Sequence, residues 1–134
     1  MRGGTENVIG IIGITKALEI AYEDMAEHQA HVESIKKHFI QSLTQEIPGI
    51  DFNGLSADLD KSLYTVLSVS LPPSEVNSGM LLFNLDLEGV LASGGSACSS
   101  GATVGSHVLR AINHTPERDT VRFSFSRFNT IEEV

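Results

Sequence analysis

A proline-free segment from Asn7 to Glu46 most strongly limits what this chain can fold into. Its apolar residues recur every three or four positions, the spacing of one face of an α-helix, and Pro48-Gly49 end the pattern. An unbroken helix here would extend on the order of 55 Å, more than a domain of this size covers. We therefore expect either a kink or a packing partner outside this chain. The apolar positions are Val8, Ile11, Ile12, Ala17, Leu18, Ala21, Met25, Val32, Ile35, Phe39 and Leu43.

The rest of the chain carries short strand and helix patterns. The segment 120-TVRFSFS-126 alternates apolar and polar residues, which is typical of a strand buried on one face. Ser74 follows two prolines and is a suitable N-cap, and Thr130 with Glu133 has the spacing of a capping box. We expect strands at 50–54, 63–71, 89–93 and 120–126, and helices at 74–87, at 105–112 and from 129 onward.

Both ends of the pattern suggest a segment of a longer polypeptide. The long helix has too little partner surface, and the capping box at Thr130 is followed by almost no helix. Terminal residues that simply fray would give the same pattern. From spacing alone the two interpretations are equally good.

Composition excludes several classes of function. The chain has 134 residues with a net charge of −8, which disfavours binding to a phosphate backbone. A lone cysteine excludes an internal disulfide and a metal site built on paired cysteines, and it suits a reducing compartment. We find no apolar run long enough to span a membrane and no signal-peptide pattern. We expect a cytoplasmic protein that binds neither nucleic acid nor membranes.

Cys98 lies in the segment 91-LASGGSACSSGATVGSHVL-109, among glycines, serines and alanines. A lone cysteine is most often a small buried hydrophobe, but this segment offers no apolar residues to bury it. A phosphate-binding loop is a second interpretation, weakened because neither a P-loop lysine nor a GxGxxG spacing is present. The third interpretation is an exposed nucleophile on a pliable loop, activated by a cation, a helix N-terminus or a cofactor. The composition favours the third.

Four motifs together carry a family resemblance. The order of 2-RGGTEN-7, the SGGSACSSG segment around Cys98, 106-SHVLRAI-112 and 121-VRFSFSRFNTIEEV-134 resembles the C-terminal part of the cysteine desulfurases. These are pyridoxal-phosphate enzymes of the class V aminotransferase branch that serve iron-sulfur cluster assembly. The resemblance covers essentially the whole chain. It implies the small C-terminal domain of a fold-type-I enzyme: an α+β fold in which a long N-terminal helix leads into a mostly antiparallel sheet of about four strands, covered by helices.

The resemblance assigns roles to three residues. Cys98 matches the cysteine whose thiolate takes sulfur from L-cysteine and carries it as a persulfide, while L-alanine is released. Arg122 matches the arginine that binds the substrate carboxylate, although strand alternation alone would suggest a surface ion pair. Thr5 matches a threonine that contacts the cofactor phosphate across the interface of a homodimer. We also expect Thr5 at the N-cap of the long helix, where the free N–H groups favour an anion and where an ordinary cap is the plainer interpretation.

The chain also departs from the family pattern. Its four lysines, Lys16, Lys36, Lys37 and Lys61, do not stand in the motif of the cofactor lysine. Residues 1–134 are therefore expected to form a single C-terminal domain, with the pyridoxal-phosphate domain upstream of residue 1 and no activity in the isolated chain. The histidines show no spacing typical of a metal site.

Other functions stay open at this stage. A selenocysteine lyase or another class V aminotransferase is the nearest enzymatic alternative. A non-enzymatic interaction domain with a redox-sensitive thiol at Cys98 is the alternative from another class. The desulfurase interpretation implies L-cysteine as substrate and a sulfur-acceptor or iron-sulfur scaffold protein as partner.

Overall fold

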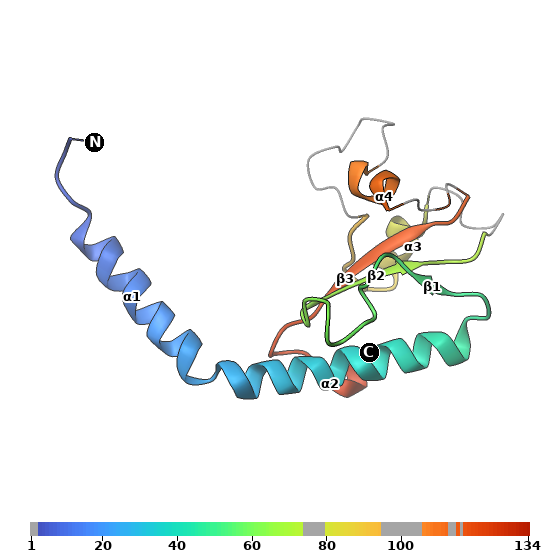
Figure 1. Ribbon diagram of the computed structural model, residues 1–134, viewed down its shortest axis with the longest axis horizontal. Coiled ribbons are helices and arrows are strands. Elements are labelled where there is room, and N and C mark those ends of the chain that lie inside the picture. Colours follow the sequence, from blue (N-terminus) through green and yellow to red (C-terminus); the bar gives the residue numbers. More distant parts are fainter. Residues whose placement is uncertain (1–2, 74–79, 95–105, 113–114, 116) are drawn as a thin grey trace.

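The computed structural model describes residues 3–73, 80–94, 106–112, 115 and 117–134. The long helical segment is kinked: α1 spans Val8–Glu23 and α2 spans Met25–Glu46 (Figure 1). Asp24 separates them because its φ of −104° and ψ of 8° leave the helical range. The sequence predicted either a kink or a packing partner outside this chain, and the kink is present.

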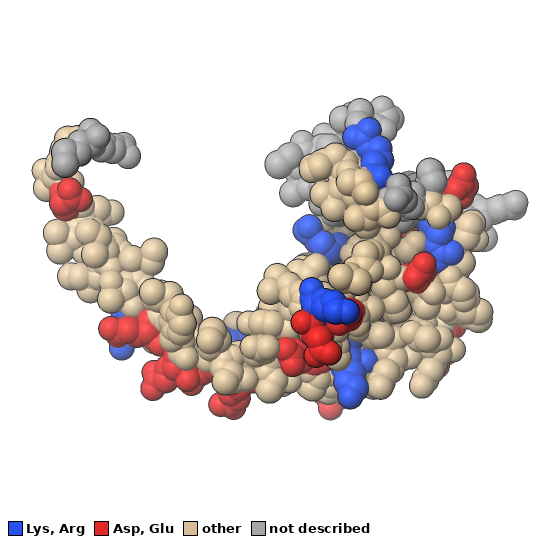
Figure 2. Space-filling model, viewed as in Figure 1, with Lys and Arg blue, Asp and Glu red and all other residues tan. Residues whose placement is uncertain are grey.

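Helix α1 extends away from the rest of the molecule (Figure 1). Every one of its residues is exposed, including a series of large apolar side chains. Ile9 is 86% exposed and Ile14 is 69% exposed, which is unusual for isoleucine in a folded domain. Figure 2 shows acidic side chains gathered on the outer side of the bend between α1 and α2. The described residues thus leave the apolar side chains of α1 in solvent.

Three antiparallel strands form the sheet in the order β1-β2-β3. β1 spans Asp51–Phe52, β2 spans Val66–Ser70 and β3 spans Thr120–Ser124, so the strands expected at 50–54, 63–71 and 120–126 are present but shorter. A single bridge from Ser93 to Arg122 occupies a fourth position beside β3.

The strand expected at 89–93 is reduced to that bridge. Gly89 has a positive φ of 79°, and the Val90 N–H donates to the Leu85 carbonyl at 2.8 Å. These features close the end of the preceding helix. They keep the first part of the segment out of the β ladder.

Three short helical elements complete the described structure. α3 spans Leu81–Leu87 with Met80 as its N-cap, so the helix expected from Ser74 begins later, and Ser74 itself lies outside the described residues. α4 spans His107–Ala111, and Figure 1 shows it on the side of the sheet away from α2. The 3₁₀ helix η1 spans Ile131–Glu133, and its capping box between Thr130 and Glu133 is formed as predicted.

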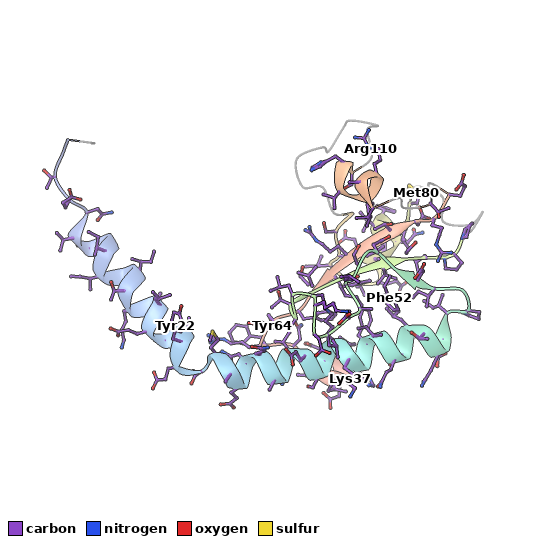
Figure 3. All side chains as sticks on the ribbon, viewed as in Figure 1. Tyr22, Lys37, Phe52, Tyr64, Met80 and Arg110 are labelled. Atoms are coloured by element: carbon purple, nitrogen blue, oxygen red, sulfur yellow. The ribbon has the colours of Figure 1, made fainter. Side chains whose placement is uncertain are left out.

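The core lies between α2 and one face of the sheet. Its buried cluster consists of Val32, Ile35, Leu67, Val69 and Phe125. Phe39 of α2 adds edge-to-face contacts with the aromatic side chains at 123 and 125, with ring centroids 4.9 and 5.7 Å apart. Phe52 packs against this cluster from β1, as the side-chain view indicates (Figure 3). The apolar side of α2 and the alternation of the strands together fix which face of the sheet is buried.

Lys36 is a buried cation at the edge of this core. It is 0% exposed, and its Nζ donates to the Ser62 hydroxyl at 2.8 Å and the Leu63 carbonyl at 3.0 Å. Burial lowers the pKa of Lys36, and the nearby Glu33 carboxylate opposes that shift. The ammonium therefore joins α2 to the segment before β2 through neutral acceptors.

Replacing Leu67 by alanine should destabilise the chain by about 2–5 kcal/mol, because a fully buried leucine leaves a cavity that its neighbours cannot fill. Leu63→Ala is the matched control, since Leu63 is 63% exposed. Its effect should stay within about 0.5 kcal/mol. Urea unfolding measures both, and equal losses would contradict the placement of the core.

Raising the pH should stabilise the chain relative to a Lys36→Met variant. Because the pKa of folded Lys36 lies below its ordinary value of 10.5, unfolding takes up a proton between these two values. Stability therefore rises with pH through that window, by about 1.4 kcal/mol for each unit of pKa lowering. Urea unfolding of both proteins between about pH 7 and pH 10 measures the difference.

Lys37→Met is the control for this effect. Lys37 is the exposed neighbour on α2, and its side chain points away from the sheet (Figure 3). The stability difference between wild type and Lys37→Met should not follow the same trend with pH. A flat difference for Lys36→Met would mean that the Lys36 ammonium is hydrated in solution.

Candidate functional site

The face of the sheet opposite the α2 core carries polar side chains. In the antiparallel register Ser68 pairs with Arg122 and Ser70 with Thr120. Paired residues project from the same face, so these four side chains lie together. The intervening residues Leu67, Val69 and Val121 are buried. One sheet therefore separates an apolar core from a polar surface on which Arg122 stands.

Arg122 pairs with Ser93 through its backbone, on the side of β3 away from β2. The Arg122 N–H donates to the Ser93 carbonyl at 2.7 Å, and the Ser93 N–H donates to the Arg122 carbonyl at 3.1 Å. The side chains also meet, with Arg122 Nη2 3.5 Å from the Ser93 hydroxyl. The side chain is half-buried, and its Nε is fully buried. A rigid strand thus presents a guanidinium, the group best suited to a carboxylate.

The neighbours of Arg122 form a polar network across the strands. The Asn53 side-chain amide donates to the Ser68 hydroxyl at 3.1 Å and lies 3.4 Å from the Thr120 hydroxyl. The Ser56 hydroxyl donates to the Ser68 carbonyl at 2.9 Å. These bonds join the segment after β1 to β2 and β3, on the β2 side of Arg122.

Arg118 plays a structural role at the end of the same face. Its Nε donates to the Ser70 hydroxyl at 2.8 Å, and its Nη2 donates to the carbonyls of Ser70 and Gly49, each at 2.7 Å. The guanidinium therefore ties β2 to the turn before β1.

A cavity of about 470 Å³ lies on the apolar side. Its lining includes Phe39 and Leu43 from α2, Leu81 and Leu85 from α3, and Phe123 from β3. Neither Arg122 nor Thr5 is among the described residues that line it. The cavity therefore lies on the face of the sheet opposite Arg122.

The segment that leads to Cys98 begins at the Ser93 bridge. Gly94 follows it and passes close to α3: a Cβ at this position would lie 3.3 Å from Leu82 Cδ1, tighter than an ordinary contact. Cys98 itself lies outside the described residues. The structure thus locates the residue where this segment leaves the sheet, directly beside Arg122.

Thr5 is exposed and precedes α1. The expectation that Thr5 is the N-cap is wrong: Asn7 is the N-cap, and its Oδ1 accepts from the Gly10 N–H at 3.0 Å. Asparagine caps a helix at least as well as threonine, which explains the choice. Figure 1 shows that the N-terminal end of α1 lies far from the sheet that carries Arg122. Within one chain the structure does not bring these two residues together.

The four lysines of this chain lie on α1, on α2 and in the segment before β2. Lys16 pairs with Glu19 at 3.1 Å and Lys61 with Asp58 at 3.2 Å. Lys36 is buried against the segment before β2, and Lys37 is exposed on α2.

Among the described residues, no three His, Cys, Asp or Glu side chains are grouped so that they could hold a metal ion.

Within the same part of the chain, no helix combines the length and the apolar character that a membrane span requires.

Comparison with protein families assigns the chain to one of them. The sequence model described as aminotransferase class-V matches residues 1–134. The chain belongs to the class-V aminotransferase family.

Two relatives show how much of the protein this class-V aminotransferase chain represents. It is 38% identical over 135 residues to the cysteine desulfurase of Gluconacetobacter diazotrophicus. It is 36% identical over 135 residues to cysteine desulfurase IscS of Dictyoglomus turgidum. Both alignments include 99% of this chain but 32% and 33% of the respective relative. The chain spans about a third of the length of the curated relatives that it matches.

Solved structures support the same family fold. One described as a NifS-like protein superposes with a TM-score of 0.72 at 30% identity, over 98% of this chain and 32% of that chain. A NifS-like protein from Rickettsia africae has the same TM-score at 22% identity, which speaks to the fold alone. The expected α+β fold with an antiparallel sheet is confirmed.

Sequence reasoning missed the partner of Arg122. Ser93 was expected at the end of a strand, but its pairing with Arg122 depends on strand order and register. A single sequence carries no direct signal for either. The burial of Lys36 was missed as well, because Lys36 is not one of the apolar positions of the helical pattern.

Proposed function

We propose that this chain is part of a cysteine desulfurase, which converts L-cysteine to L-alanine and carries the released sulfur as a persulfide on Cys98. The observation that carries the proposal is the bridge between Ser93 and Arg122, by which an arginine lies beside the residue from which the chain leads to Cys98. The names of the relatives support the same activity. Five residues lead from Ser93 to Cys98, and such a chain spans at most about 18 Å.

Arg122 binds the carboxylate of L-cysteine in this proposal. A guanidinium donates two parallel hydrogen bonds to a carboxylate and stays charged at any physiological pH. Its position in β3 supports the role, because the bridge to Ser93 and the pairing with β2 hold its backbone in place. The arginine orients the substrate so that its sulfur faces the incoming thiolate.

Cys98 supplies the nucleophile. Its thiolate attacks the substrate sulfur, so a sulfur–sulfur bond forms while the Cβ–S bond of the substrate breaks. The electron pair of the broken bond stays with Cβ and takes up a proton, which gives the methyl group of alanine. L-cysteine and a thiol thus become L-alanine and a persulfide, with no external oxidant required.

The cofactor belongs to the remainder of the polypeptide in this proposal. Residues 1–134 correspond to the C-terminal domain, and a domain upstream of residue 1 supplies the lysine that holds pyridoxal phosphate. The cofactor, when bound, withdraws electrons from the substrate so that its Cβ–S bond can break. Thr5 contacts the cofactor phosphate of a neighbouring subunit in a homodimer, and the separation of the N-terminal end of α1 from the sheet within one chain supports a role in the partner's site (Figure 1).

The persulfide passes to an acceptor protein in the cytoplasm. An iron-sulfur cluster scaffold or a sulfur-relay protein has the required nucleophilic thiol. A carrier on a segment that begins at the sheet surface suits this transfer, because the sulfur must leave the substrate site to meet the acceptor.

Replacing Cys98 by serine in the full-length protein should lower alanine formation from L-cysteine by a factor of about 100 or more, because a hydroxyl is a far weaker nucleophile toward sulfur. Alanine release and persulfide labelling of the protein measure the effect. Ser99→Ala is the control next to it in sequence and should retain activity. Full persulfide formation in Cys98→Ser would contradict the assignment.

The 134-residue chain alone should release no alanine from L-cysteine, because in this proposal the lysine that holds the cofactor lies outside residues 1–134. Incubating the chain with pyridoxal phosphate and L-cysteine, followed by amino-acid analysis, tests this. Alanine above the level of a cofactor-only blank would show that the chain builds a complete site.

Arg122→Lys should raise the KM for L-cysteine by about 10- to 100-fold with a smaller change in kcat, because an ammonium cannot form the paired hydrogen bonds. Arg127→Lys is the matched control, since that guanidinium lies over the Phe128 ring at 4.9 Å on the exposed end of the same segment. Equal KM values for wild type and Arg122→Lys would remove Arg122 from the substrate site.

A further inference from the structure

Ser93 and Arg122 are joined by three hydrogen bonds. Two join the backbones, at 2.7 and 3.1 Å, and the third joins Arg122 Nη2 to the Ser93 hydroxyl at 3.5 Å. Each residue donates its backbone N–H to the carbonyl of the other, so the two form a hydrogen-bonded antiparallel pair. The side chains of such a pair project from the same face of the sheet. The serine hydroxyl therefore lies beside the guanidinium because of the backbone pairing.

Ser93 is itself held from a second direction. Its neighbour Gly94 passes so close to α3 that a Cβ would meet Leu82 Cδ1 at 3.3 Å. The Ser93–Gly94 unit thus lies between β3, to which Ser93 is hydrogen-bonded, and the Leu82 side chain of α3, which leaves little room for a side chain at Gly94. A hydroxyl on such a fixed backbone can restrict the rotamers of a long side chain.

We propose that Ser93 is a positioning residue that holds the Arg122 guanidinium in the orientation that receives the substrate carboxylate. This inference rests on the proposed role of Arg122 as the carboxylate-binding group. A guanidinium that is already oriented loses less rotational freedom when the substrate binds. Ser93 therefore strengthens substrate binding and does not change the rate of the sulfur-transfer step.

The first test observes Arg122 directly, without turnover. In the ¹⁵N-labelled 134-residue chain, the Arg122 Nε–Hε signal is assigned as the one that Arg122→Lys removes. Ser93→Ala should shift this signal and speed its hydrogen exchange about threefold, because the guanidinium gains mobility. Ser124→Ala makes the same chemical change on an exposed residue two positions further along the segment and should leave the signal unchanged.

The second test uses the full-length protein. Ser93→Ala should raise the KM for L-cysteine about 3- to 10-fold, since a long hydrogen bond to a charged donor contributes modestly, with kcat within about twofold of wild type. In an Arg122→Lys background Ser93→Ala should add no further increase, because the group that it positions is already gone. A general loss of structure would instead add to the effect of Arg122→Lys.

Two further variants of the same shape distinguish the loss of the hydroxyl from a general loss of structure. Ser93→Thr keeps the hydroxyl and Ser93→Val lacks it, while both carry the same branched shape. Threonine should behave like wild type in both measurements, and valine should behave like Ser93→Ala.

The outcomes separate this inference from the proposed function. An unchanged Hε exchange rate in Ser93→Ala, or equal behaviour of the threonine and valine variants, overturns the positioning role. If the exchange rate changes as expected while the full-length protein releases no alanine from L-cysteine, Ser93 does position Arg122 and the desulfurase proposal fails.

Discussion

The contact between α2 and the inner face of the sheet is the interaction on which the other features depend. Val32 and Ile35 meet Leu67, Val69 and Phe125 in a buried cluster, and this burial supplies the main favourable free energy of folding. The same contact settles the orientation of every strand residue, because successive side chains alternate between faces. Once the apolar positions face α2, the positions of Arg122 and its serine neighbours on the other face follow.

The sequence was sufficient for features that repeat along the chain. The alternation over 120–126 predicted both β3 and the outward direction of Arg122, and the spacing of Thr130 and Glu133 predicted the cap that forms. Contacts between segments that are distant in the sequence could not be predicted. The Ser93 bridge needs strand order, and the burial of Lys36 needs the path of the chain before β2. The wrong N-cap has a local cause: Thr5 and Asn7 are both suitable caps near the start of α1, and Asn7 caps the helix.

The structure divides the proposed reaction among parts of different rigidity. Arg122 stands on a strand paired on both sides, whereas Thr5 precedes a helix that extends away from the core. A substrate-binding group benefits from a rigid support, because orientation lost on binding reduces affinity. A phosphate contact at the far end of α1 suits a site assembled with another part of the protein or with a second subunit, which agrees with the uncovered apolar side chains of α1.

The strict alternation in β3 also restricts how this region can change by insertion or deletion. A single extra residue between Thr120 and Arg122 would turn the guanidinium toward Phe39 and the α2 core and would turn Phe123 toward solvent. The fold and the proposed substrate-binding group would then both be lost through one insertion. Length variation in a lineage that keeps the activity should therefore fall in the connections between strands, while β3 tolerates only substitutions.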